Sequence, residues 1–411
     1  MAVEKHTLAN GLRVVAVHNP QSAMAVVDVL YDVGSRDESR ALTGMAHLFE
    51  HLMFGGSVNV PSFDAELEGA GGKSNAWTSL DFTNFYDVLP ARNIATAFHL
   101  ESDRMLALDF ERTTLEVQRS VVIEEFKQRC LNSPYGDLSH RLREVAYAAE
   151  HPYSWPTIGL TPEHIAAVTE ENVKSWFYSH YAPNNAILTV TSPLPAAEVF
   201  GLADEWFADI PRREIKRRSL PEPGFPADGA VVDVRGRAPQ PRVMVVYPMD
   251  HYGTDDYFAA DTITDILAYG PSSRMQRRLV DGPLAGFFAG ADASITGSEH
   301  HGLLLLNAMI TDDSDAGCRR AAALLREQFE TLAKEGDISE AELERTLNNF
   351  EASYRMENVS AMARTLTEAM AEYHDEVPAE MIARRRTLTR AALAATAARM
   401  AEREPITLIY R

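Results

Sequence analysis

Residues 43–54 read Thr-Gly-Met-Ala-His-Leu-Phe-Glu-His-Leu-Met-Phe, and two glycines follow at positions 55 and 56. The apolar residues of this stretch recur at i, i+3, i+4, i+7 and i+8, namely Met45, Leu48, Phe49, Leu52 and Met53. This spacing predicts a helix with one buried face, and the glycine pair predicts its end. The segments before and after this helix indicate which elements pack against its buried face.

Strand-like runs surround this helix in the first half of the chain. They lie at 12–17, 24–31, 84–89 and 185–191, with long helical segments between 93 and 129. The second half repeats the plan, with a strand-like run at 242–247, helices at 255–268, 316–335 and 340–356, and a last run at 406–410. The repetition indicates an internal duplication. Only the first copy carries histidines on its leading helix, whereas the second carries Asp261 and Asp265.

A change of composition separates the two halves. Prolines and basic residues are concentrated between 211 and 226, which is typical of a solvated linker. We therefore predict an N-terminal domain at 1–210, a linker at 211–228 and a homologous C-terminal domain at 229–411. The length of 411 residues agrees with two domains of about 200 residues each.

Composition excludes several classes of protein. The formal net charge of −20 argues against nucleic acid as a partner, because a surface that binds phosphates is basic. No apolar run approaches the roughly 20 residues of a membrane-spanning helix, and Cys130 and Cys318 form no disulfide or metal-binding pattern. The first residues lack the apolar region of a signal peptide. We expect a cytoplasmic protein, or a periplasmic one if an export signal has been removed.

The pentapeptide His47-Leu48-Phe49-Glu50-His51 predicts a metal site. On a helix, His47 and His51 project from one face about one turn apart, so two neutral imidazoles can bind one tetrahedral zinc ion. Glu50 lies on the same side, where it can act as general base toward water that the metal activates. The pattern H-x-x-E-H is the inverted zincin motif. A chance grouping is the alternative, but histidines on a buried helix are costly unless they are paired or ligated.

A site with two histidines needs a third protein ligand. The segment 121–126 reads Val-Val-Ile-Glu-Glu-Phe and offers two adjacent carboxylates, Glu124 and Glu125, in an apolar helical stretch. One alternative is that one of them is exposed and the other is ion-paired. Beside two predicted histidine ligands, a metal-binding glutamate is the better interpretation, and the residues alone leave open which of the two it is.

These motifs resemble those of the insulinase/pitrilysin (M16) metallopeptidases, especially the short bacterial members that are similar to mitochondrial processing peptidase. That family carries H-x-x-E-H on its first long helix and a ligand glutamate at the end of an E-R-x-V-V-x-E-E segment. Residues 118–125 read Gln-Arg-Ser-Val-Val-Ile-Glu-Glu here. The resemblance covers nearly the whole chain. It implies an α+β fold of the LuxS/M16-like type, with two homologous domains that are each a mixed or antiparallel sheet covered by helices.

The resemblance also implies roles for single residues. It places the third zinc ligand at Glu125. Glu124 and Gln118 would then belong to the shell of residues that surrounds the ligands. Many members of the family have a further glutamate at the position of Gln118. Residues 71–78, Gly-Gly-Lys-Ser-Asn-Ala-Trp-Thr, are similar to the stretch that leads into the active-site edge strand, which binds peptides by backbone pairing. Asn75, with Ala76 beside it, is the residue that we expect to bind substrate.

The second domain departs from the family pattern. Active members have an arginine and then a tyrosine that hold the substrate, whereas Gly286 occupies the tyrosine position here. The resemblance therefore suggests a homodimer, or a heterodimer in which a homologous chain supplies the arginine–tyrosine pair.

The function that we expect is that of a zinc-dependent endopeptidase. It would cleave peptides or unfolded segments bound as an added β-strand inside a clamshell chamber, with Glu50 as general base. One alternative is a non-catalytic structural subunit, like the core proteins of a respiratory complex in this superfamily; the intact His47, Glu50 and His51 argue against it. The other is a zinc hydrolase of a non-peptide substrate, which the edge-strand features disfavour.

Overall fold

The computed structural model describes residues 2–110, 112–215, 217–225, 227–297, 299–334 and 336–411. Lys216 and Pro226 of the predicted linker lie outside the described residues. The chain forms two compact units that interleave along the sequence. The first comprises Met1–Lys127, Trp155–Leu220 and Tyr354–Met381, and the second comprises Gln128–Ser154, Pro221–Ser353 and Ile382–Arg411.

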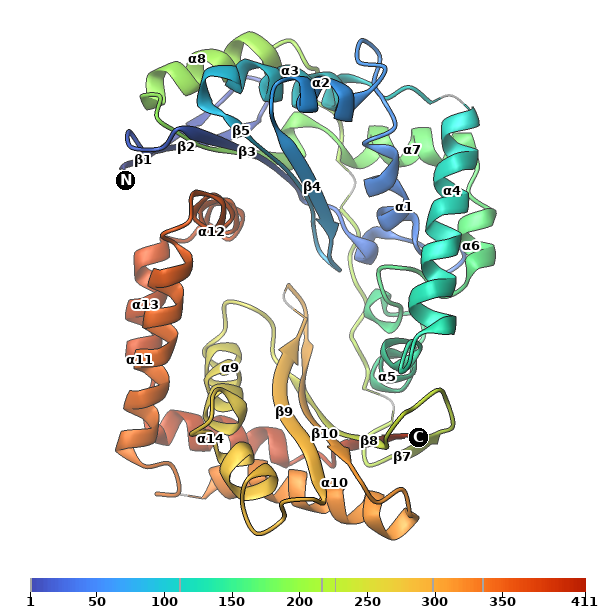
Figure 1. Cartoon of the computed structure of the whole chain (residues 1–411), viewed down its shortest axis with the longest axis vertical. Helices are drawn as coiled ribbons and strands as arrows, with labels where there is room; N and C mark the ends of the chain where they lie inside the picture. The colour runs from blue at the N-terminus through green and yellow to red at the C-terminus, as the bar shows by residue number, and fades with distance from the viewer. Residues whose placement is uncertain (1, 111, 216, 226, 298, 335) are drawn as a thin grey trace. The chain divides into compact units, whose positions relative to one another are not determined.

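The first unit is built on a six-stranded mixed sheet with the order β1-β2-β6-β3-β5-β4 (Figure 1). The strands are β1 Ala2–Thr7, β2 Arg13–His18, β3 Met24–Tyr31, β4 Lys73–Thr78, β5 Thr83–Pro90 and β6 Ala186–Ser192. Helices α2, α3 and α8 cover one face, and α12 packs on the other. The helices of this unit are α1 Met45–Leu52, α2 Phe63–Gly69, α3 Ile94–Leu106, α4 Arg112–Phe126, α6 Pro162–Ala166, α7 Glu170–His180, α8 Ala196–Phe207 and α12 Ala361–Tyr373.

The second unit is built on a five-stranded sheet with the order β7-β11-β8-β10-β9. Its strands are β7 Val231–Val234, β8 Arg242–Met249, β9 Phe288–Thr296, β10 Gly302–Ile310 and β11 Ile406–Tyr410. Its helices are α5 Leu138–Ala146, α9 Asp255–Ala268, α10 Asp315–Glu330 and α14 Arg390–Ala401, while α11 Glu340–Glu357 and α13 Pro378–Arg386 pass from one unit to the other along the chain. Among the described residues, no helix has the length and apolarity needed to cross a bilayer.

The two sheets share one topology. In each, the last strand of the repeat lies between two earlier strands, parallel to one and antiparallel to the other: β6 between β2 and β3, and β11 between β7 and β8. Strand β1 adds a further strand to the first sheet, beside β2. Helix α1 follows β3 as α9 follows β8. The predicted α+β class with two homologous, helix-covered sheets is therefore confirmed.

The compact units do not coincide with the predicted domains 1–210 and 229–411 and the linker 211–228. The predicted domains are continuous and follow the two sequence repeats, whereas the compact units exchange segments. Residues 128–154 belong to the second unit and residues 354–381 to the first. Residues 354–381 contain helix α12, and the packing of this helix on the first sheet explains why the segment belongs to the first unit. Ala369 of α12 lies in a buried cluster with Val15, Val17, Leu30 and Ile187 of the first sheet. A hydrogen bond of 2.6 Å from Thr365 to Thr191 adds a polar contact to this apolar packing.

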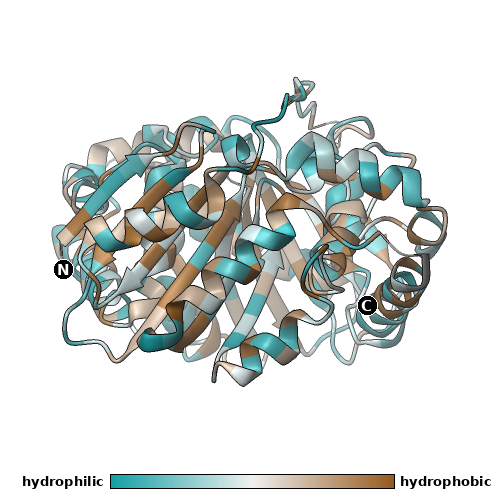
Figure 2. Ribbon diagram, turned by 90° about the horizontal axis from the view of Figure 1, so that it is seen from above, coloured by the Kyte–Doolittle hydropathy of each residue, from teal (hydrophilic) through white to brown (hydrophobic). Residues whose placement is uncertain are grey.

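The helices carry alternating hydrophobic and hydrophilic bands (Figure 2), whereas the inner strands β2, β3 and β6 are largely buried. Strand β3 is buried along almost its whole length, because it lies inside the sheet and both of its faces are covered. A strand in that position is expected to be continuously apolar, and Asp28 is the exception. Its Oδ1 accepts a hydrogen bond of 2.7 Å from the side-chain amide of Asn84.

The stability of the first unit should depend on pH through Asp28. Burial raises the pKa of Asp28 from its ordinary value of 3.8 to about 8, and nearby Glu101 adds to this, against the hydrogen bond from Asn84. Between pH 3.8 and about pH 8, Asp28 is protonated in the folded chain and ionised in the unfolded chain. The contribution of Asp28 to the free energy of unfolding is thus full below pH 4 and falls as pH rises toward 8, by up to about 1.4 kcal/mol per pH unit.

We expect the substitution Asp28→Asn to remove this dependence, because the amide stays neutral at every pH. Urea denaturation of both proteins at pH 5 and pH 9 measures it: the stability of the variant relative to the wild type should rise at the higher pH. A difference between the two proteins that stays constant across this range would contradict the assignment.

Candidate metal centre

A buried carboxylate holds the start of helix α1. The helix begins after Gly44, and Glu38 accepts hydrogen bonds from the backbone N–H groups of Gly44 at 3.0 Å and Ala46 at 2.8 Å. Trp155 donates its indole N–H to the same carboxylate at 3.1 Å. An acceptor at this end satisfies N–H groups that have no partner within the helix and that carry partial positive charge. Helix α1 lies beside α4 (Figure 1).

The structure brings His47, His51 and Glu125 together. The Nε2 atoms of His47 and His51 lie 3.7 Å and 3.3 Å from Oε2 of Glu125. The two imidazole rings stand at 89° to each other with their centroids 4.9 Å apart. One donor atom from each residue lies within 4.8 Å of the other two, and this is the only such group of metal-binding side chains in the described part of the chain.

These donors fit a zinc ion. Zinc bonds of about 2.0–2.1 Å to nitrogen and about 2.0–2.2 Å to oxygen in a tetrahedron place neighbouring donors roughly 3.4 Å apart. The separations of 3.7 Å and 3.3 Å between the Nε2 atoms of the two histidines and Oε2 of Glu125 agree with that spacing. Two imidazoles and one carboxylate are also a ligand set of catalytic zinc sites, in which the fourth position is left open.

Glu50 projects from the same helix and meets strand β4. Its Oε2 accepts a hydrogen bond of 2.5 Å from the hydroxyl of Thr78. The side chain is half-buried, as are those of both histidines. The general base predicted from sequence therefore contacts the last residue of the edge strand from the helix that carries both histidines. No role for Thr78 was predicted from the sequence, although its side chain, two residues after Ala76, faces the same side of the strand.

The other two predicted residues of α4 do not join the cluster. The side chain of Glu124 is 71% exposed and pairs with Lys127 at 2.6 Å, whereas that of Glu125 is 19% exposed. Gln118 is half-buried and lies two turns before Glu125 on the same helix face. The roles predicted for Glu124 and Gln118 remain predictions.

Strand β4, which carries Asn75 and Ala76, lies at the edge of its sheet, and in the part of the chain that the structure describes it pairs only with β5. In the turn that joins the two strands, the N–H of Ser79 donates to the carbonyl of Phe82. Hydrogen-bonded and non-hydrogen-bonded pairs alternate along an antiparallel ladder. Trp77 and Asn75 are therefore the residues of β4 whose backbone groups form hydrogen bonds with β5. The backbone groups of Ser74, Ala76 and Thr78 therefore face the open edge.

The side chain of Asn75 supports this register. It is exposed, and its Oδ1 accepts a hydrogen bond of 2.9 Å from the N–H of Ala76, a group that points away from β5. The structure thus places both predicted substrate-binding residues at an edge that can accept another strand.

In the second unit, Gly286 has a φ of +88°, which a residue with a side chain adopts only with strain. Its carbonyl accepts a hydrogen bond of 2.8 Å from the hydroxyl of Thr311. A Cβ atom at this position would meet no neighbour within 4 Å. The space for a larger residue is therefore present, but the backbone conformation favours glycine.

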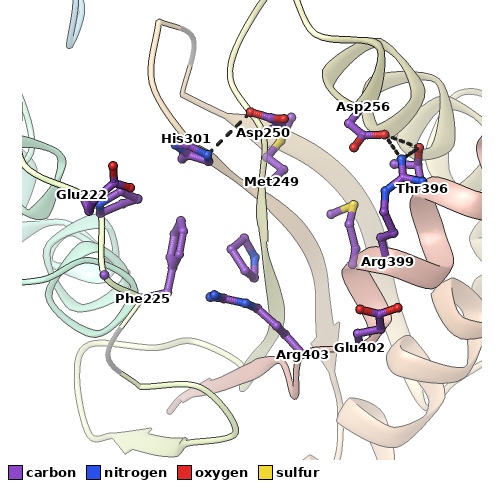
Figure 3. Close-up of a pocket in the computed structure, with 14 residues that line it drawn as sticks. Glu222, Phe225, Met249, Asp250, Asp256, His301, Thr396, Arg399, Glu402 and Arg403 are labelled. Atoms are coloured by element: carbon purple, nitrogen blue, oxygen red, sulfur yellow. Dashed lines mark hydrogen bonds and ion pairs between the residues drawn. The ribbon is translucent and has the colours of Figure 1, made fainter.

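A cavity of about 480 Å³ lies in the second unit, and none of its lining residues belongs to the predicted site (Figure 3). Buried Phe225 forms part of an apolar floor. At the rim, Arg399 is ion-paired with Asp256, and His301 lies 3.6 Å from Asp250. Among the described residues, these groups form no three-donor metal group of the kind found on α1 and α4.

Comparison with protein families finds two matches that follow each other along the chain. Residues 13–151 match the family described as Insulinase (Peptidase family M16), and residues 167–350 match the family described as Peptidase M16 inactive domain. The first match contains His47, Glu50, His51 and Glu125.

Individual proteins agree with these matches. The chain is 30% identical to the zinc protease PqqE of Helicobacter pylori over 359 residues, which cover 85% of this chain and 79% of that protein. It is 23% identical to the beta subunit of the mitochondrial-processing peptidase of Saccharomyces cerevisiae, over 84% of this chain and 76% of that protein. The crystal structure of a protease from Helicobacter pylori superimposes with a TM-score of 0.88 and 27% identity, covering 100% of this chain and 99% of the other.

Proposed function

Because this chain belongs to the M16 family of peptidases, we propose that it is a zinc-dependent endopeptidase of peptides or unfolded segments that bind as an added β-strand. The observation that carries the proposal is the convergence of His47, His51 and Glu125 within 4.8 Å. Glu50 on the same helix and the open edge of β4 complete the arrangement. Homologues of this chain are named zinc proteases, which supports zinc as the metal.

Zinc bound by these three residues would supply a Lewis acid that activates water near neutral pH and polarises a carbonyl oxygen. Glu50 would accept the proton of the attacking water and deliver it to the leaving amine. The outward backbone groups of Ser74, Ala76 and Thr78 would pair with an extended peptide and align its carbonyl with Glu50. Backbone pairing does not read side chains, so a broad sequence preference follows.

A non-catalytic role is less well supported. The match to an inactive domain begins at residue 167, after all four residues of the site. A structural subunit would need neither two histidines and a carboxylate at ligand spacing nor a glutamate beside them. The edge strand argues for a peptide over a non-peptide substrate, since an open ladder recognises a polypeptide backbone.

We also propose that the active form pairs two chains. Gly286 leaves the second unit without the tyrosine that active members use to hold substrate, and its left-handed backbone disfavours a side chain there. A homodimer would lack that hydroxyl in both copies. A homologous chain with the arginine–tyrosine pair would supply it, and such pairing agrees with the resemblance to one subunit of the mitochondrial-processing peptidase.

We expect the purified chain to cleave an unstructured peptide slowly and to lose this activity to a chelator. Poor positioning of the peptide alone can lower rates by large factors. Addition of a homologous chain that has the arginine–tyrosine pair but lacks H-x-x-E-H should raise the rate strongly. Steady-state cleavage with and without that chain, before and after chelation and return of zinc, measures both effects.

Turnover of about 10 per second by the chain alone, an ordinary enzyme rate, would show that no second chain is required. Cleavage that survives complete removal of the metal would contradict the proposed function itself. The two outcomes are independent, because chelation tests the metal site and mixing tests the partner.

A further inference from the structure

A hydroxyl from the edge strand reaches the proposed general base. Thr78 lies at the last position of β4, and its Oγ1 donates to Oε2 of Glu50 at 2.5 Å. A hydrogen bond to an ionised carboxylate is short and roughly twice as strong as one between neutral groups. The two residues are 28 positions apart in the sequence, so this contact exists only because β4 and α1 lie side by side (Figure 1).

The contact restrains a side chain that has several rotatable bonds. A glutamate on the exposed side of a helix loses rotamer freedom only when something holds it. Glu50 is half-buried, and its neighbours on the helix, Phe49 and His51, point to the core and to the cluster with Glu125. The hydroxyl of Thr78 thus fixes the carboxylate on the side where the strand and the metal donors meet.

The backbone of Thr78 belongs to the edge that faces an incoming strand. Its pair with Thr83 is one of the non-hydrogen-bonded pairs of the ladder, like that of Ala76 with Phe85. A peptide added to the edge would therefore bond to the same residue whose side chain holds Glu50. Thr78 therefore connects the binding of a peptide along β4 with the orientation of the Glu50 carboxylate.

We propose that Thr78 is a positioning residue of the peptidase reaction, which orients Glu50 and links that orientation to the peptide bound along β4. The inference rests on the proposed function and extends it. A purely structural alternative is that the hydrogen bond only ties β4 to α1, in which case its loss would weaken folding or metal binding and leave the chemistry intact.

The test compares Thr78→Val, which has nearly the same shape but no hydroxyl, with Thr78→Ser, which keeps the hydroxyl. We expect Thr78→Val to lower kcat about 10- to 100-fold, the usual range for residues that orient a catalytic group. KM and zinc content should stay near the wild-type values, and Thr78→Ser should restore most of kcat. Crystal structures of the metal-free proteins supply a readout besides activity: Glu50 should leave its place in Thr78→Val and keep it in Thr78→Ser.

Thr83→Val is the matched control. Thr83 lies directly opposite Thr78 on β5, but its hydroxyl donates to the carbonyl of Val33 at 2.9 Å. Its loss should lower stability and leave kcat unchanged. If Thr78→Val does not fold, the smaller Thr78→Ala replaces it with the same expectations.

Full kcat in Thr78→Val, or a fall that appears only in KM or in zinc content, would overturn the inference. Glu50→Gln, measured in parallel, separates this result from failure of the proposed function. If that variant is inactive while Thr78→Val is fully active, only the role of Thr78 is refuted. If Glu50→Gln is active, the proposed base is refuted as well.

Discussion

Glu50→Gln is expected to keep its fold and its zinc and to lose turnover by about two to four orders of magnitude, the usual contribution of a general base. The glutamine amide has the size of the carboxylate and can still accept the hydrogen bond from Thr78. It cannot take up a proton, so only the proton transfer is removed. Steady-state cleavage of an unstructured peptide, with zinc content determined on the same sample, measures the effect.

The control for this variant is Glu38→Gln, which alters a carboxyl group at the start of the same helix. Glu38 is buried and accepts hydrogen bonds from the start of α1, so its substitution should lower the melting temperature while the active fraction retains its kcat. Glu50→Gln should show the opposite pattern, with an unchanged melting temperature and a lost kcat. Near-wild-type cleavage by Glu50→Gln would show that another group accepts the proton.

His47→Ala or His51→Ala should release the zinc and abolish activity. Each substitution leaves two donors from the protein where a stable site needs three or more. We expect the zinc content of either purified variant to fall from about one ion per chain to a small fraction, and free zinc should not restore the rate. A variant of either histidine that retains stoichiometric zinc would refute the ligand assignment.

The two adjacent glutamates provide a matched pair for the third ligand. Glu125→Gln should weaken zinc binding strongly, because Glu125 lies 3.3 Å from His51 and 3.7 Å from His47. Glu124→Gln changes the same group one residue away, where the side chain is exposed and paired with Lys127. Its zinc affinity should stay near that of the wild type. Equal losses in both variants would contradict the geometry of α4.

The sequence alone predicted the elements whose pattern is local. The strand at 24–31 and the helix at 255–268 coincide with β3 and α9, because side-chain periods of 2 and 3.6 residues follow from backbone geometry. The same reasoning placed His47 and His51 on one helix face, and the structure brings them together. The resemblance to a family added the fold class, which the two sheets confirm.

The tertiary structure decided what depends on distant parts of the chain. Adjacent residues on a helix point in different directions, so neither periodicity nor composition could show from the residues alone that Glu125 turns toward the histidines and Glu124 toward solvent. The packing of α12 on the first sheet joins residues more than 170 positions apart. The bond from Thr78 to Glu50 likewise requires β4 to lie against α1. Local pattern specifies an element and its buried face, but which elements meet depends on the free energy of packing the whole chain.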